Sequence, residues 1–144
     1  MWTIPRSVVS DMEQHARDAR PGECCGILIG LPGRVLESRR AANLAGDPNR
    51  FLVDPGAHVR ALRESRHQHL DIVGFYHSHP HSAPIPSARD LAEASYPDLI
   101  HAIVGLQNDL AETQVYRLFG ERFERVAVEV VDTPLTAGRP EAAS

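Results

Sequence analysis

The sequence has few of the features that mark secreted, membrane-spanning or nucleic-acid-binding proteins. Only two of its 144 residues are cysteine, and because they are adjacent they do not suit the disulfide framework of a small secreted domain. No apolar run approaches the roughly 20 residues of a membrane-spanning helix, and the first residues do not resemble a signal peptide. The formal net charge of −4 favours neither nucleic acid nor an anionic membrane as partner. We therefore expect a cytoplasmic protein.

The composition is that of a globular chain. Hydrophobic residues make up 42% and charged residues 24% of the sequence, and 144 residues suffice for one domain with a real core. No internal repeat or linker divides the chain. We expect one domain over residues 1–132, followed by a flexible tail over residues 133–144, where Pro, Gly, Ala and Ser predominate.

Apolar periodicity and turn residues predict helices interspersed with strands. The predicted helices span residues 7–20, 55–68 and 87–96, and the predicted strands span residues 23–30, 34–42, 51–53, 71–76, 99–106, 113–119 and 123–131. Asp54 precedes Pro55, which is typical of a helix N-cap followed by proline at the first helical position. This order predicts a mixed α/β domain, with a central sheet and helices against it.

The most informative stretch is His77-Ser78-His79, followed by Ser87 and Asp90. Side chains at i and i+2 of an extended segment project to one side, so the two imidazoles can face a common atom. Ser87 and Asp90 are three residues apart at the start of a predicted helix, and the proline-rich loop between can fold that helix end back. Two imidazoles and one carboxylate are ligands that zinc accepts, with a fourth position left for water.

Each part of this pattern has a simpler interpretation. A His-x-His pair alone is more often a surface or structural feature, and Ser87 with Asp90 resembles a capping box. An Asp90 bound to metal would not be free to cap the helix. His81 is another imidazole nearby, but Pro80 breaks the regular path, so we expect it to face solvent or substrate. The pattern does not by itself separate zinc from iron or manganese.

These residues resemble the JAMM motif of the MPN-type metallopeptidases. The family's motif also has a glutamate upstream, on the first strand after an N-terminal helix, and Glu23 stands in that context before Cys24-Cys25-Gly26. The order of predicted elements is similar to that of the family over residues 4–131. The resemblance implies a single MPN domain, with a curved mixed β-sheet flanked by helices.

The resemblance also implies a role for each motif residue. His77, His79 and Asp90 correspond to the zinc ligands, and Glu23 corresponds to the general base that holds and deprotonates the zinc-bound water. Such a water has a pKa near neutrality, and a nearby carboxylate can pass its proton to the leaving amine. Ser87 corresponds to the hydroxyl that stabilises the oxyanion, and Ser78 to a supporting residue between the ligands.

Short, stand-alone members of this family act on ubiquitin-like small sulfur-carrier proteins. By resemblance we expect a zinc peptidase or isopeptidase that cleaves after the C-terminal Gly-Gly tail of such a carrier. Three alternatives remain: a general small-peptide or amino-acid-conjugate zinc hydrolase, a metal-binding scaffold without turnover, and an α/β domain whose histidines are coincidental. The sequence does not determine the substrate protein, the residue on the leaving side or the oligomeric state.

Overall fold

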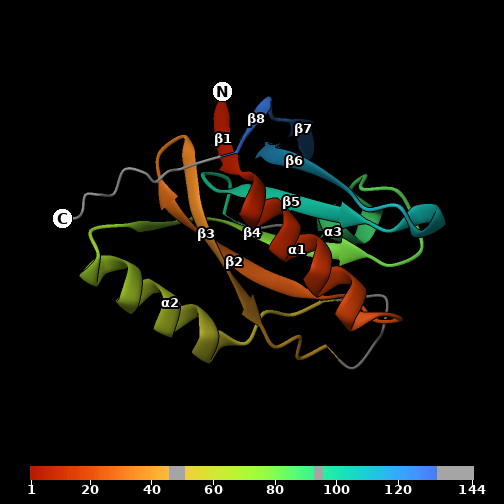
Figure 1. Ribbon diagram of the computed structural model, residues 1–144, viewed down its shortest axis with the longest axis horizontal. Coiled ribbons are helices and arrows are strands. Elements are labelled where there is room, and N and C mark those ends of the chain that lie inside the picture. Colours follow the sequence, from red (N-terminus) through yellow and green to blue (C-terminus); the bar gives the residue numbers. More distant parts are fainter. Residues whose placement is uncertain (46–50, 93–95, 133–144) are drawn as a thin grey trace.

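The computed structural model describes residues 1–45, 51–92 and 96–132. In these ranges the chain forms a mixed α/β domain, as the sequence predicts (Figure 1). Its elements in chain order are β1 (Trp2–Pro5), α1 (Arg6–Ala19), β2 (Cys25–Leu31), β3 (Arg34–Ala41), α2 (Pro55–His67), β4 (Asp71–His79), α3 (Ala88–Ala92), β5 (Ile100–Gly105), the 3-10 turn Gln107–Asp109, β6 (Glu112–Phe119), β7 (Arg122–Arg125) and β8 (Val128–Val131).

One sheet of eight strands organises the domain, in the order β7-β6-β5-β4-β2-β3-β1-β8. The two edge strands are consecutive in the chain: β7 pairs with β6, and β8 pairs with β1. Between them, Val126 donates its N–H to Val115 (2.8 Å) and Trp2 donates to Ala127 (3.0 Å). The sheet is therefore curved so strongly that a single stretch of chain joins its two ends.

Helix α1 covers one face of the sheet over the larger apolar core (Figure 1). Its residues Val8, Met12 and Ala16 recur at helical spacing and are buried against strand residues such as Leu28 and Tyr76. Gly26 allows this packing, since a Cβ there would lie 2.1 Å from the Tyr76 ring. Side chains of α1 and of the middle strands consequently fill the space between the helix and this face of the sheet.

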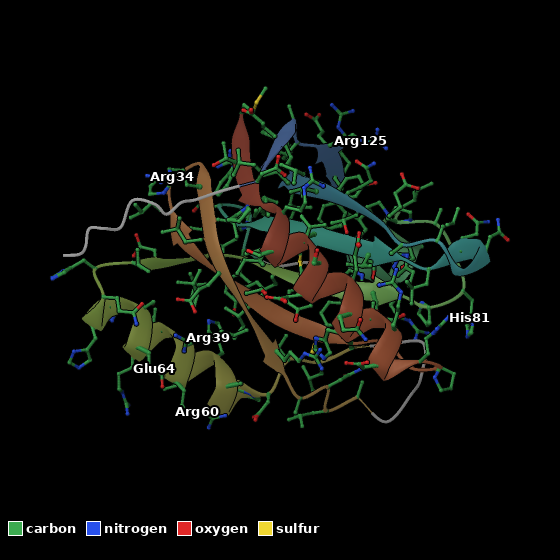
Figure 2. The ribbon with its side chains drawn as sticks, viewed as in Figure 1. Arg34, Arg39, Arg60, Glu64, His81 and Arg125 are labelled. Carbon is green, nitrogen blue, oxygen red and sulfur yellow. The ribbon has the colours of Figure 1, made fainter. Side chains whose placement is uncertain are left out.

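Helix α2 lies on the opposite face over a smaller cluster, in which Ala61 packs with Ile27, Ile29 and Phe75. The N-cap predicted for this helix is confirmed, because the Asp54 carboxylate accepts the N–H of Gly56 at 3.0 Å. The helix is also tied to β3 by an ion pair, in which the side chains of Arg39 and Glu64 point toward one another (Figure 2). Strands β2 and β4 are therefore buried on both faces, which explains their nearly continuous apolar sequence.

Several predicted boundaries are wrong. Residues 51–53 form no strand, only an isolated bridge between Asn43 and Val53. The stretch 123–131 is two strands, because its halves pair with opposite ends of the sheet. Strand β1 was not predicted, since four residues beside a proline carry little periodic signal.

Other expectations concern residues that the structure describes only in part. The predicted end of the third helix involves residues 93–95, and the predicted tail, residues 133–144, also lies outside the described ranges. The division into a domain and a tail therefore stays a prediction. Among the described residues, no helix combines the length and apolar character needed to cross a membrane.

Candidate metal centre

The two histidines of the motif lie at the carboxyl end of β4, which is three residues longer than predicted. Pairing continues to this end on both sides: Cys25 of β2 lies opposite His77, and Gly105 of β5 lies opposite His79. Phe75 belongs to the cluster under α2, and alternation along the strand puts both imidazoles on this same face of the sheet. The prediction that the two imidazoles share one side is confirmed, since their Nε2 atoms are 3.3 Å apart.

Ser78 points to the other face, where it is fully buried. Its hydroxyl oxygen accepts the N–H of Cys24 at 2.9 Å, and its own N–H donates to the Cys24 carbonyl at 3.2 Å. These two bonds join β4 to the start of β2 at the level of the histidines. The contacts favour a supporting role for Ser78 rather than a reactive one.

Hydrogen bonds attach the loop after His79 to the residue following β5 and to a side chain of β6. Leu106 donates its N–H to the His79 carbonyl (3.1 Å), and the Tyr116 hydroxyl donates to the carbonyl of Pro84 (2.7 Å). Gly105 leaves room for the loop, because a Cβ there would lie 2.6 Å from the Pro84 nitrogen. This anchoring turns the chain back, so that α3 begins beside the histidines.

Ser87 and Asp90 form a reciprocal capping box at the start of α3. The Asp90 N–H donates to the Ser87 hydroxyl (3.0 Å), and the Ser87 N–H donates to Oδ2 of Asp90 (2.8 Å). Asp90 therefore caps the helix and faces the two histidines at the same time. A carboxylate has about four lone-pair positions, so one N–H leaves most of its acceptor capacity free.

Three ligand atoms converge at the end of β4. Nε2 of His77 lies 3.2 Å from Oδ1 of Asp90, and Nε2 of His79 lies 3.0 Å from Oδ2. The two Nε2 atoms are 3.3 Å apart, so two imidazole nitrogens and the two oxygens of one carboxylate form a compact group. Ligands at 2.0–2.1 Å from a tetrahedral zinc ion are about 3.3 Å apart, which is similar to the separations between these residues. The His-His-Asp group is compatible with a metal site.

The electrostatics of the site favour the ligand forms of Asp90 and His77. Burial opposes ionisation of Asp90, but hydrogen bonds from His77 and His79 outweigh it and hold the pKa of the carboxyl well below its usual range. Burial lowers the pKa of His77, although Asp90 partly opposes this. An ionised carboxylate and a neutral imidazole are the forms that bind a metal.

A backbone carbonyl orients the second imidazole. Nδ1 of His79 lies 3.0 Å from the Ala83 carbonyl oxygen. Because a carbonyl oxygen only accepts hydrogen bonds, Nδ1 carries a proton and is the donor. When Nε2 gives up the proton that it shares with Asp90, its lone pair can bind a metal while Nδ1 keeps this hydrogen bond, as is usual for ligating histidines. Burial alone would lower the pKa of His79, but Asp90 and the Ala83 carbonyl outweigh it and raise the pKa.

Glu23 lies two residues before the start of β2, beside the same strand end. Because Cys25 lies opposite His77 and Cys24 bonds to Ser78, the register continues to bring Glu23 level with His79. Alternation then directs its side chain to the face of the imidazoles. Its negative charge contributes to the raised pKa of His79, consistent with this placement.

Some residues around the site were not identified from the sequence. The ring of Phe51 stacks on His77, and Tyr116 anchors the loop, yet neither belongs to a local pattern that would have marked it. His81, the imidazole considered as a further ligand, is exposed and lies at the margin of the molecule (Figure 2). It is not part of the His-His-Asp group.

Comparison with known proteins agrees with the geometry. Residues 5–119 match the family described as prokaryotic homologues of the JAB domain. The chain belongs to this family. A desampylase of Haloferax volcanii is 32% identical over 127 residues, which cover 86% of this chain and 89% of the relative. A CysO-cysteine peptidase of Mycobacterium tuberculosis is 28% identical over 132 residues, covering 90% of each protein.

Solved structures show the same fold. A protein of Desulfitobacterium hafniense superposes with a TM-score of 0.84 at 26% identity, over 92% of this chain and 94% of that one. A protein of Archaeoglobus fulgidus, described as a JAB1/MPN domain protein, gives a TM-score of 0.60 at 21% identity, over 92% and 98% of the two chains. The expected MPN fold, a curved mixed sheet flanked by helices, is thereby confirmed.

Proposed function

We propose that this protein is a zinc-dependent peptidase that hydrolyses the bond after the C-terminal Gly-Gly tail of a ubiquitin-like small sulfur-carrier protein. The observation that carries the proposal is the grouping of His77, His79 and Asp90 at the end of β4, where contacts between their side chains are 3.0 to 3.3 Å long. It occurs in a chain that belongs to the family of JAB-domain homologues.

In this proposal His77, His79 and Asp90 hold the zinc ion, which leaves one coordination position open. Bound zinc would supply Lewis-acid chemistry, lowering the pKa of a water molecule and polarising the scissile carbonyl. The donor set supports zinc because it combines two imidazoles with one carboxylate, at separations similar to those of zinc ligands.

The remaining residues of the motif handle protons and charge. The carboxylate of Glu23 accepts the proton of the attacking water and delivers it to the leaving amine. The Ser87 hydroxyl accepts the N–H of Asp90, so its own hydrogen is available to donate to the oxyanion of the substrate carbonyl. Ser78 keeps the histidine strand attached to β2 through Cys24.

The substrate class is supported by the relatives. These relatives are named desampylase, CysO-cysteine peptidase and, for a protein of Thermus thermophilus, probable TtuB-protein conjugate cleaving protease. The first two are matched over 86% and 90% of this chain. A cytoplasmic location is part of the proposal, and the two free, buried thiols suit a reducing compartment.

The test combines metal analysis with hydrolysis of a carrier protein conjugated through its C-terminus to cysteine or lysine. Glu23→Gln should retain one zinc per chain but turn over about 10²- to 10⁴-fold more slowly, because only the proton acceptor is removed. The assignment of the base is wrong if this variant hydrolyses as fast as the wild type.

The same assay separates the alternatives. Comparable hydrolysis of the isolated Gly-Gly tail peptide and the intact carrier would indicate a general small-peptide hydrolase. Full zinc occupancy without turnover of any conjugate would indicate a metal-binding scaffold. Purified protein without stoichiometric metal would overturn the proposal.

A further inference from the structure

The side chain of Asn43, two residues beyond β3, connects three segments around the site. Its Nδ2 donates to the carbonyl of Glu23 (2.9 Å), and its Oδ1 accepts the N–H groups of Ala45 (3.0 Å) and Leu52 (2.8 Å). One amide therefore attaches Glu23, two residues before β2, to two segments of the connection between β3 and α2. Side chains that satisfy several backbone groups at once constrain the segments strongly.

The position of Asn43 follows from the sheet. Ala41 of β3 lies opposite Cys25, and continuing this antiparallel register brings Asn43 level with Glu23. The connection is held further by two backbone bonds, from Leu44 to Leu52 (2.8 Å) and from Asp54 to Ala42 (3.1 Å). The Asn43 amide thus sits between the general base of the proposed mechanism and the segment that contains Phe51.

Phe51, next to Leu52, contacts the metal centre directly. Its ring stacks on the imidazole of His77, with centroids 4.3 Å apart and planes inclined by 16°. The imidazole of His79 is oriented by the Ala83 carbonyl, and the His77 ring is in contact with Phe51 across its face and with Asp90 through Nε2. A ligand whose plane is held by its neighbours loses less conformational entropy when a metal binds.

We propose that Asn43 and Phe51 are positioning residues of the metal centre, Phe51 orienting the His77 ligand and Asn43 holding Phe51 and Glu23 in one arrangement. The Asn43 part rests on the proposed function, since it assigns Glu23 as the base. The Phe51 part concerns metal binding alone. The two parts therefore have separate readouts.

The Phe51 part is tested by metal affinity, measured with Co²⁺ and Zn²⁺ in competition with a chromophoric chelator. Phe51→Leu should bind either ion about 10-fold more weakly and alter the visible absorption of the Co²⁺ form, because the imidazole plane is released. Phe51→Trp should restore both, since it retains a stacking ring. The matched control is Leu52→Ala, which removes an exposed side chain from the adjacent position and keeps the N–H that Asn43 accepts.

Equal affinities and Co²⁺ spectra for Phe51→Leu, Leu52→Ala and the wild type would overturn the Phe51 part. This outcome is readable even if no conjugate is ever hydrolysed. Failure of the proposed function would instead appear as a wild type that binds metal normally but does not turn over.

The Asn43 part is tested by steady-state kinetics. Asn43→Ala should lower kcat about 10- to 100-fold with KM changed less than about 3-fold, because the base is displaced while substrate binding persists. In a Glu23→Gln background the same substitution should have almost no further effect on kcat. Asn43→Asp keeps the acceptor oxygen but loses the donor to the Glu23 carbonyl, so its kcat should lie between those of the wild type and Asn43→Ala. This variant also keeps the test possible if Asn43→Ala does not fold.

Full additivity of Asn43→Ala with Glu23→Gln would overturn the Asn43 part, since two residues that act through one group cannot be independent. A kcat for both Asn43 variants equal to that of the Leu52→Ala control would overturn it as well.

Discussion

The two faces of β4 differ in what covers them. On the α1 face, Tyr76 and Ser78 are fully buried beneath Met12 and Ala16, and the cover is a regular helix. On the other face, α2 covers Phe75 but the cover over His77 comes from loop residue Phe51 and from α3. The candidate metal site lies where the regular helical cover stops and side chains from short segments take its place.

This difference shows how one strand can serve both stability and a site. Alternation sends every second side chain of β4 to each face, so the same residues that fill the α1 core also fix the spacing of the two imidazoles. The α1 face should therefore control folding, and the end of the α2 face should control metal binding.

The largest expected effect concerns Asp90. Asp90→Asn keeps an oxygen that can accept the Ser87 N–H but removes the charge, so the helix cap should persist while zinc affinity collapses. We expect substoichiometric metal after dialysis and a loss of about 10³-fold or more in hydrolysis. Atomic absorption and circular dichroism measure the two properties separately. Retention of full zinc by Asp90→Asn would contradict the assignment of this ligand.

A smaller effect is expected from the α1 face. Met12 is completely buried, and Met12→Ala should lower the free energy of unfolding by about 2–5 kcal/mol, because it leaves a cavity. The zinc affinity and kcat of the folded protein should remain within about 2-fold of the wild type. Urea denaturation followed by fluorescence measures the first quantity, and kinetics below the transition measure the second. A large fall in kcat without loss of stability would show that the two faces are not separable.

The smallest effect compares the adjacent thiols, which alternation directs to opposite faces. Burial raises the pKa of Cys24 to about 11 and that of Cys25 to about 12, so the native state holds both protons longer than the unfolded chain. The contribution of each protonated thiol to the free energy of unfolding should be fully present below the ordinary thiol pKa, near 9, and should fall as the pH rises toward 11. At pH 10 the free energy of unfolding should be lower by about 1 kcal/mol per thiol.

Denaturation at a series of pH values, repeated with Cys24→Ala and with Cys25→Ala, measures this loss for each face. Each substitution should remove about half of the alkaline loss. If only Cys24→Ala does so, water reaches the α2 face at the level of His77, and the two faces differ more than their burial indicates.

Much of the secondary structure was predictable because its signals are local. The spacing of Val8, Met12 and Ala16 predicted α1, and Asp54 before Pro55 predicted the start of α2. The errors occurred where pairing decides the outcome. Residues 51–53 have strand-like composition but only one bridge partner, and the stretch 123–131 divides because it serves both ends of the sheet.

The candidate site was predictable to a similar extent. The His-x-His spacing and the Ser-x-x-Asp spacing are local, and the grouping of His77, His79 and Asp90 in the structure agrees with them. Sequence reasoning treated capping and ligation by Asp90 as exclusive, because it did not count the separate lone pairs of the carboxylate. Phe51 and Asn43 were missed, since their contacts join segments far apart in the chain and leave no periodic trace.

The sequence alone determined the donor types, their spacing within each segment and the element order, because these depend on neighbours a few residues apart. The tertiary structure decided the rest: that α3 returns to the end of β4, that the three ligand atoms lie 3.0 to 3.3 Å apart, and that Phe51 stacks on His77. Those properties depend on sheet curvature and on the anchoring of the loop by Tyr116. Both arise from contacts between distant segments, whose geometry forms only when the whole chain folds.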